Sequence, residues 1–93
     1  MNIHSTAIVS SKAKIGENVI IGPNTIIYDN VEIGNNCVIG AFCEIGVSNH
    51  LSEGEILNIG ENSTIRSHSI FYEGSVFGES LTTGHRVTVR EKV

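Results

Sequence analysis

The chain has 93 residues, a net charge of −4 at neutral pH, ten glycines and no tryptophan. This length allows one domain at most. The six basic residues are scattered, which argues against a nucleic-acid partner, because nucleic-acid surfaces gather Lys and Arg. No run is long and apolar enough for a membrane span. Since no secretion signal is visible at the N-terminus, we expect a cytoplasmic protein in which Cys37 and Cys43 are free thiols.

A six-residue repeat begins at Ile3 and continues to Ile45. The repeated aliphatic positions are Ile3, Val9, Ile15, Ile21, Ile27, Ile33, Ile39 and Ile45. Glycine follows directly at 16, 22, 34, 40 and 46, and asparagine stands three residues on at 18, 24, 30 and 36. Small or β-branched residues occupy the fourth position after each aliphatic from Ile3 to Ile39. An amphipathic helix needs apolar spacings of three and four, and a β-sandwich would not hold one register for so long.

The repeat is interrupted between Val47 and Asn58. Continuing the register through this stretch would send Glu55 inward, which is costly for an unpaired carboxylate. The pattern resumes at Ile59 and continues through Ile65, Phe71, Phe77, Thr83 and Val89. The sequence therefore predicts coils over residues 3–46 and 59–93 and a protruding loop over 47–58.

Three hexads close one triangular coil of 18 residues in a solenoid of this kind, so each inward residue stacks on the residue one coil away. Ile3, Ile21 and Ile39 should form one such column, and Cys37 and Cys43 should be small core residues at neighbouring corners. Glycine and asparagine supply the left-handed backbone that the turns need. We expect an all-β fold with about four and a half coils, forming a single domain over residues 1–93.

The repeat resembles that of the hexapeptide-repeat, or isoleucine-patch, acyltransferases. This resemblance implies a left-handed parallel β-helix, a homotrimer, and active sites between subunits in which a histidine is often the general base. The run Thr83-Gly84-His85, Val87 and Val89-Arg90-Glu91 is also similar to one in sugar O- and N-acetyltransferases. It implies an acetyl-CoA-dependent acetyltransferase acting on a hydroxyl or amine of a small-molecule sugar or nucleotide-sugar of the cell-surface polysaccharide type. Acetyl-CoA would be the co-substrate, and no metal is expected.

Two of the four histidines are candidate catalytic residues, since imidazole suits proton transfer at neutral pH. One coil before His85 the chain has Ser67, so His68 and His85 should share an edge, with Arg86 over His68. We predict His85 and His68 as catalytic. His4, in the first hexad, and His50, in the predicted loop, are expected to be solvated.

A second group of polar residues follows from the same coil subtraction. It stacks Arg90 on Tyr72 and Glu91 on Glu73, on the edge next to that of the histidines. We predict Arg86, Arg90, Glu91 and Tyr72 as substrate-binding residues. Glu73 and Glu91 are otherwise expected to be surface charges.

Two alternatives remain open. The chain stops at Val93, one residue short of a full hexad, and this leaves open the N-terminal part of a longer enzyme or a truncated, non-catalytic trimeric β-helix module as alternatives to an enzyme complete in this chain. A zinc hydratase resembling the γ-type carbonic anhydrases needs three imidazoles at a subunit interface. His68 and His85 could supply two of them, but the charged companions of that family are not matched.

Overall fold

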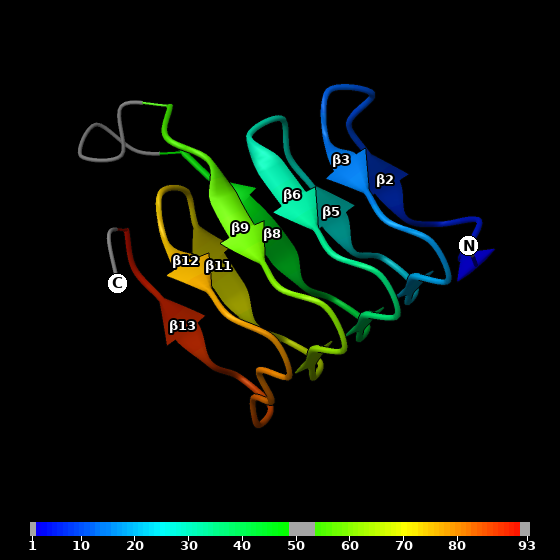
Figure 1. The fold of residues 1–93 in the computed structure, drawn as a ribbon. Helices are drawn as coiled ribbons and strands as arrows, with labels where there is room; N and C mark the ends of the chain where they lie inside the picture. The colour runs from blue at the N-terminus through cyan, green and yellow to red at the C-terminus, as the bar shows by residue number, and fades with distance from the viewer. Residues whose placement is uncertain (1, 49–53, 92–93) are drawn as a thin grey trace.

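The computed structural model describes residues 2–48 and 54–91, and these form a left-handed parallel β-helix (Figure 1). The described residues contain thirteen short strands and no helix. The strands are β1 (Asn2–Ile3), β2 (Ile8–Val9), β3 (Lys14–Ile15), β4 (Ile20–Ile21), β5 (Ile26–Ile27), β6 (Val31–Ile33), β7 (Val38–Ile39), β8 (Glu44–Val47), β9 (Leu57–Ile59), β10 (Thr64–Ile65), β11 (Ile70–Tyr72), β12 (Val76–Phe77) and β13 (Thr88–Val89).

Successive strands fall on three parallel sheets. Sheet 1 has the order β1-β4-β7-β10, sheet 2 the order β2-β5-β8-β11-β13, and sheet 3 the order β3-β6-β9-β12. Each of four complete coils contributes one strand to every sheet, and a fifth adds β13 and a bridge from Thr82 to Thr64. Ile3 pairs with Ile21, Ile21 with Ile39 and Ile39 with Ile65, which confirms the predicted column.

The core is a thin column of inward side chains from the aliphatic and small repeat positions. The fully buried hydrophobic residues include Ile21, Ile27, Ile39, Ile45, Ile59, Ile65 and Phe71. Cys37 and Cys43 are both buried and free, as predicted. In the later coils the small positions become Ser63, Ser69 and Ser75, whose hydroxyls donate to the carbonyl oxygens of Gly60, Arg66 and Arg90 at 2.8–3.0 Å. Each of these three buried hydroxyls therefore has a hydrogen-bond acceptor, as buried polar groups require.

Two of the three corners turn through a left-handed residue, beginning with Asn18 and Asn24. Between sheets 3 and 1 this residue is Asn18, Asn36, Asn62 or Ser80, with φ between 58° and 62°. Between sheets 1 and 2 it is Asn24, Phe42, His68 or Arg86, with φ between 55° and 62°. From Asn36 onward its N–H donates to a carbonyl of the preceding coil, as in the 3.0 Å bonds from Phe42 to Pro23 and from Asn62 to Asn35. The N–H of Asn24 donates instead to Thr6 Oγ1 at 2.8 Å.

The insert leaves the solenoid between sheets 2 and 3, and it is narrower than the predicted loop over 47–58. Val47 ends β8, while Leu57 and Asn58 belong to β9. Leu57 is fully buried and pairs with Val31 one coil earlier, because it takes the inward position two residues before the repeated aliphatic. Glu55 is exposed, in agreement with the argument against continuing the register. Residues 49–53 of the predicted loop lie outside the described residues.

Candidate active site

The candidate catalytic histidines lie on the corner between sheets 1 and 2. We call this the histidine corner and define it as residues 4–6, 22–24, 40–42, 66–68 and 84–86. His85 Nδ1 lies 2.7 Å from Ser67 Oγ, one coil earlier. This contact confirms the predicted register, in which Ser67 is the residue beneath His85. When Nδ1–H donates to the serine oxygen, the lone pair of the imidazole is on Nε2, and His85 is exposed to solvent.

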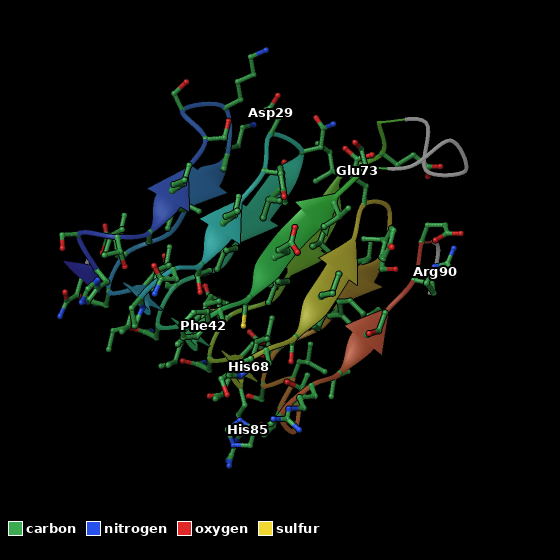
Figure 2. The ribbon with its side chains drawn as sticks, turned by 180° about the vertical axis from the view of Figure 1, so that it is seen from behind. Asp29, Phe42, His68, Glu73, His85 and Arg90 are labelled. Atoms are coloured by element: carbon green, nitrogen blue, oxygen red, sulfur yellow. The ribbon has the colours of Figure 1, made fainter. Side chains whose placement is uncertain are left out.

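His68 occupies the left-handed turn position in the coil before Arg86. Its ring stacks on that of Phe42, with centroids 5.2 Å apart and an interplanar angle of 15°. Arg86 takes the equivalent turn position one coil later, where its N–H donates to the Ser67 carbonyl at 3.0 Å. Arg86 thus follows His68 in the column, as predicted. Figure 2 shows Phe42, His68 and His85 along one edge of the solenoid.

The other predicted substrate-binding residues gather at a different corner, between sheets 2 and 3. The Arg90 guanidinium lies over the Tyr72 ring, 5.0 Å from its centroid, which confirms the predicted stacking. Arg90 Nε and Nη2 also contact the Glu91 carboxylate at 3.1 and 3.4 Å. Strands β11 and β13 separate this group from the histidines, and Figure 2 shows Arg90 well away from His85. Arg90 therefore contacts both Tyr72 and Glu91, and this group lies apart from the histidine corner.

Glu73 is not the surface charge that was expected. It is only 3% exposed, and its Oε2 accepts a hydrogen bond from Asn30 Nδ2 at 2.7 Å. The reason is the irregular pairing of β11 with β8, in which Tyr72 pairs with Val47 rather than with Gly46. The shift is local, because Val76 again pairs with Asn58 in the 18-residue register. The Glu73 carboxylate lies among polar groups near the base of the insert.

His4, Cys43 and Tyr28 are titratable groups that contribute nothing to the pair formed by His85 and Ser67. His4 is exposed, and its Nδ1 contacts Thr6 Oγ1 at 2.9 Å; His50 lies outside the described residues. Burial raises the pKa of the Cys43 thiol. Hydrogen bonds with the backbone of Ser69 and His68 lower this pKa, but by less than burial raises it. A hydrogen bond to Glu44 raises the pKa of the Tyr28 hydroxyl, with burial adding to it. Both groups therefore keep their protons at neutral pH.

Residues 2–48 and 54–91 lack the features of a metal site and of a membrane-spanning helix. They contain no group of three or more His, Cys, Asp or Glu side chains placed to hold a metal ion. They also contain no helix that could cross a membrane. Surface depressions occur on other parts of the solenoid, including one of about 390 Å³ along Gly16, Gly34 and Gly60. The histidine corner is a convex edge, so a single chain presents the imidazoles without enclosing them.

A family of known proteins matches part of the six-residue repeat. Residues 12–46 match the family described as bacterial transferase hexapeptide (six repeats). The match supports the hexapeptide-repeat superfamily, to which the spacing of the aliphatic residues already points. It ends before the insert, so it does not include His68 or His85. No curated protein was found to match the chain.

Phe42 and Arg66 are two residues of the histidine corner that the sequence reasoning passed over. A signal for Phe42 was available, because it stands where earlier hexads have Asn18, Asn24 and Asn36. Its contact with His68 was harder to foresee, since the insert makes the separation 26 residues rather than 18. Arg66 directly follows β10, beside Gly40 in the preceding coil, whose N–H donates to Ile65.

Proposed function

We propose that this protein is an acyltransferase that moves an acetyl group from acetyl-CoA to a hydroxyl or amine of a sugar or nucleotide-sugar. The hexapeptide-repeat match and the resemblance of residues 83–91 to sugar acetyltransferases support this class of reaction. The observation that carries the proposal is the 2.7 Å contact between His85 Nδ1 and Ser67 Oγ, because it orients an exposed imidazole as a general base needs.

In this mechanism His85 Nε2 takes the proton from the acceptor hydroxyl or amine. The acceptor oxygen or nitrogen then attacks the thioester carbonyl carbon, so that a new C–O or C–N bond forms while the C–S bond breaks. His85 passes the proton to the departing thiolate, which leaves as the thiol. Ser67 is a positioning residue here, because it acts through the imidazole and keeps Nδ1 occupied. General base catalysis of this kind contributes roughly 10²–10⁴-fold to a rate.

Assembly is part of the proposal. A convex edge cannot exclude water alone, whereas a neighbouring subunit against it would form the second wall of a site. The outward face of sheet 1 beside the corner carries exposed Ile20 and Val38, and Phe42 is 53% exposed. These apolar groups support a homotrimer in which sheet 1 and the corner lie against the next subunit. Sedimentation equilibrium checks this assembly, and a monomer at micromolar concentration would contradict it.

The first test is a transfer assay with the purified protein. Acetyl-CoA and a panel of sugars and nucleotide-sugars are supplied, and products are followed by mass spectrometry as acetylated acceptors. Ser67→Ala should lower kcat about tenfold with little change in KM. The His85 imidazole loses its hydrogen-bond partner, but its backbone position in the coil is unchanged. Ser67→Thr, which keeps the hydroxyl, should recover most of the loss.

A properly assembled trimer with no transfer to any acceptor would contradict the proposal. It would favour instead a non-catalytic β-helix module. Equal kcat values for Ser67→Ala and the unchanged protein would remove the serine from the mechanism while leaving the activity in place.

A further inference from the structure

Sheet 1 lies between two corners of opposite charge. The corner between sheets 3 and 1 precedes each strand of sheet 1 from β4 onward, and the histidine corner follows it. The histidine corner contains no acidic residue, but it has Arg66 and Arg86 together with three of the four histidines. The corner between sheets 3 and 1 has no Lys or Arg. It consists of residues 16–18, 34–36, 60–62 and 78–80, and its charged residues are Glu17, Glu61 and Glu79.

All five of these Glu and Arg side chains are exposed in the single chain. None of them belongs to an ion pair among residues 2–48 and 54–91. Glu61 and Arg66 stand before and after the same strand of sheet 1, five residues or roughly 16 Å of extended chain apart. An ion pair needs a separation of about 4 Å. The acidic and basic edges of sheet 1 therefore meet only when two chains come together.

The charges at the two corners also occur in the same rows, where a row is one strand of sheet 1 with the corner residues before and after it. In the β10 row, Glu61 comes before the strand and Arg66 comes after it. In the row that follows, Glu79 comes before and Arg86 after. The β7 row has no charged residue at either corner. Glu17, in the β4 row, is the exception, because no basic residue follows that strand.

Matching rows favour a second copy that runs in the same direction. A chain related by rotation about an axis parallel to the solenoid keeps every row at its own height. Coils rise by about 4.8 Å, so the two ends of one row differ in height by less than half of that. The two corners then meet with Arg66 opposite Glu61, Arg86 opposite Glu79 and the uncharged ends of the β7 row together. An antiparallel copy reverses the order of the rows and loses this match along most of sheet 1.

The apolar face between the two corners agrees with this arrangement. Sheet 1 carries the exposed side chains of Ile20 and Val38 on its outward face. Head-to-tail contacts between identical chains close into a ring when the rotation allows it. Because each coil is triangular, three copies joined corner to corner turn their sheet 1 faces toward a common axis. The contact thus buries exposed aliphatic side chains while it pairs the charges.

We propose that the corner between sheets 3 and 1 of a second copy of this chain covers the histidine corner. Glu61 of the partner subunit pairs with Arg66, and Glu79 of the partner subunit pairs with Arg86. Charge-assisted pairs of this kind fix the register of an interface as well as stabilising it. The neighbouring copy thereby brings to the site carboxylates that the histidine corner lacks within one chain. This inference deepens the proposed function, and it rests on that proposal for the number of subunits.

Charge reversal in the β10 row tests this contact by sedimentation equilibrium of the full chain. Glu61→Arg and Arg66→Glu should each raise the concentration at which half of the trimer dissociates by about tenfold or more, because each replaces an attraction by a repulsion. The double variant, which carries both changes, should return this concentration to within about threefold of the unchanged protein. The two side chains are too far apart to pair within one chain, so such a recovery comes from contact between chains.

Glu17→Arg is the matched control. It makes the same change of net charge as Glu61→Arg and lies at the same corner, but no basic residue stands opposite it in its row. It should therefore change the dissociation concentration by less than about threefold. Far-ultraviolet circular dichroism of every variant verifies that the solenoid is folded.

Recovery of assembly in the double variant supports the proposal. A double variant that assembles no better than the two single variants would overturn the corner contact and leave the trimer and the reaction in place. So would a loss of assembly in Glu17→Arg as large as that in Glu61→Arg. Because sedimentation requires no turnover, recovery of assembly without acetyl transfer would refute the proposed reaction alone. A chain that is monomeric at micromolar concentration would overturn this contact together with the proposed assembly.

Discussion

The left-handed residues of the histidine corner differ most clearly from their counterparts at Arg86. This side chain is exposed and has a φ of 58°, whereas Asn62 has a φ of 61° in the equivalent position of the other corner. Arg86→Asn should therefore raise the free energy of unfolding by about 0.5–1 kcal/mol, because asparagine tolerates this region better. The reciprocal change, Asn62→Arg, should lower it by a similar amount. Urea denaturation of the pair at high salt, which screens ion pairs between subunits, checks both signs.

A gain in stability that accompanies a loss of ligand binding would mark Arg86 as a residue kept for function. If Arg86→Asn instead destabilised the protein by more than 1 kcal/mol, the arginine would have a structural role that its exposure does not suggest.

Cys43 gives a prediction on pH. Its pKa is raised in the folded protein, chiefly by burial, so the folded state holds its proton at pH values where the unfolded thiol has lost it. Stability from this group is complete below the unfolded pKa of about 8.5 and is lost as pH rises toward the higher folded pKa. The fall can reach about 1.4 kcal/mol per pH unit for one proton. Cys43→Ser should flatten the slope between pH 8.5 and 10, measured by urea unfolding.

The hydrogen bond to Glu44 also raises the pKa of Tyr28, so this group adds a loss of stability of the same sign as the pH rises above about 10. An identical slope for Cys43→Ser and the unchanged protein below pH 10 would show that Cys43 is not the group responsible.

At the scale of the strands, Gly46 is the point where the regular coil gives way to the insert. It lies within β8 with a φ of +90°, and a Cβ atom there would clash with Val31 Cγ2. Gly46→Ala should cost about 2–4 kcal/mol, because overpacking of the buried valine adds to backbone strain. Gly78→Ala is the control, since a Cβ on Gly78 meets nothing within 4 Å; it should change stability by less than about 1 kcal/mol. Thermal unfolding of both variants tests the difference.

Much of the fold could be predicted from the sequence, because one residue type recurs at one spacing. The columns through Ile21 and Ile39 follow directly from that spacing, and so does the inward position of Cys37 and Cys43. The insert was harder to place. Leu57 fills an inward position that the aliphatic-glycine pattern does not mark, so the strand begins before the pattern visibly resumes.

The site was predictable only where the 18-residue register holds. Ser67 beneath His85 and Arg90 over Tyr72 both lie within the coils after the insert, and both contacts are present. The contact of Phe42 with His68 crosses the insert, so subtraction of one coil does not reveal it. The burial of Glu73 accompanies the irregular pairing of β11 with β8, and the six-residue pattern does not predict this irregularity.

At the scale of the whole molecule, the solenoid separates its charges by edge. Glu17, Glu61 and Glu79 lie on the corner between sheets 3 and 1, while the histidine corner has no carboxylate and carries arginines and imidazoles beside the apolar face of sheet 1. This division places the proposed chemistry at a single edge that a neighbouring subunit can cover. Arg90 and Glu91, at the corner between sheets 2 and 3, form an ion pair with each other and lie away from this edge (Figure 2).

The kcat for acetyl transfer by His85→Gln tests the central claim most directly. Glutamine keeps a polar group near Ser67 but cannot accept the acceptor's proton, so kcat should fall roughly 10²–10⁴-fold with the trimer and its melting temperature unchanged. Lys14→Gln, which is remote from the corner, should retain the full rate. A His85→Gln protein that transfers acetyl groups as fast as Lys14→Gln would contradict the assignment of His85 as the base.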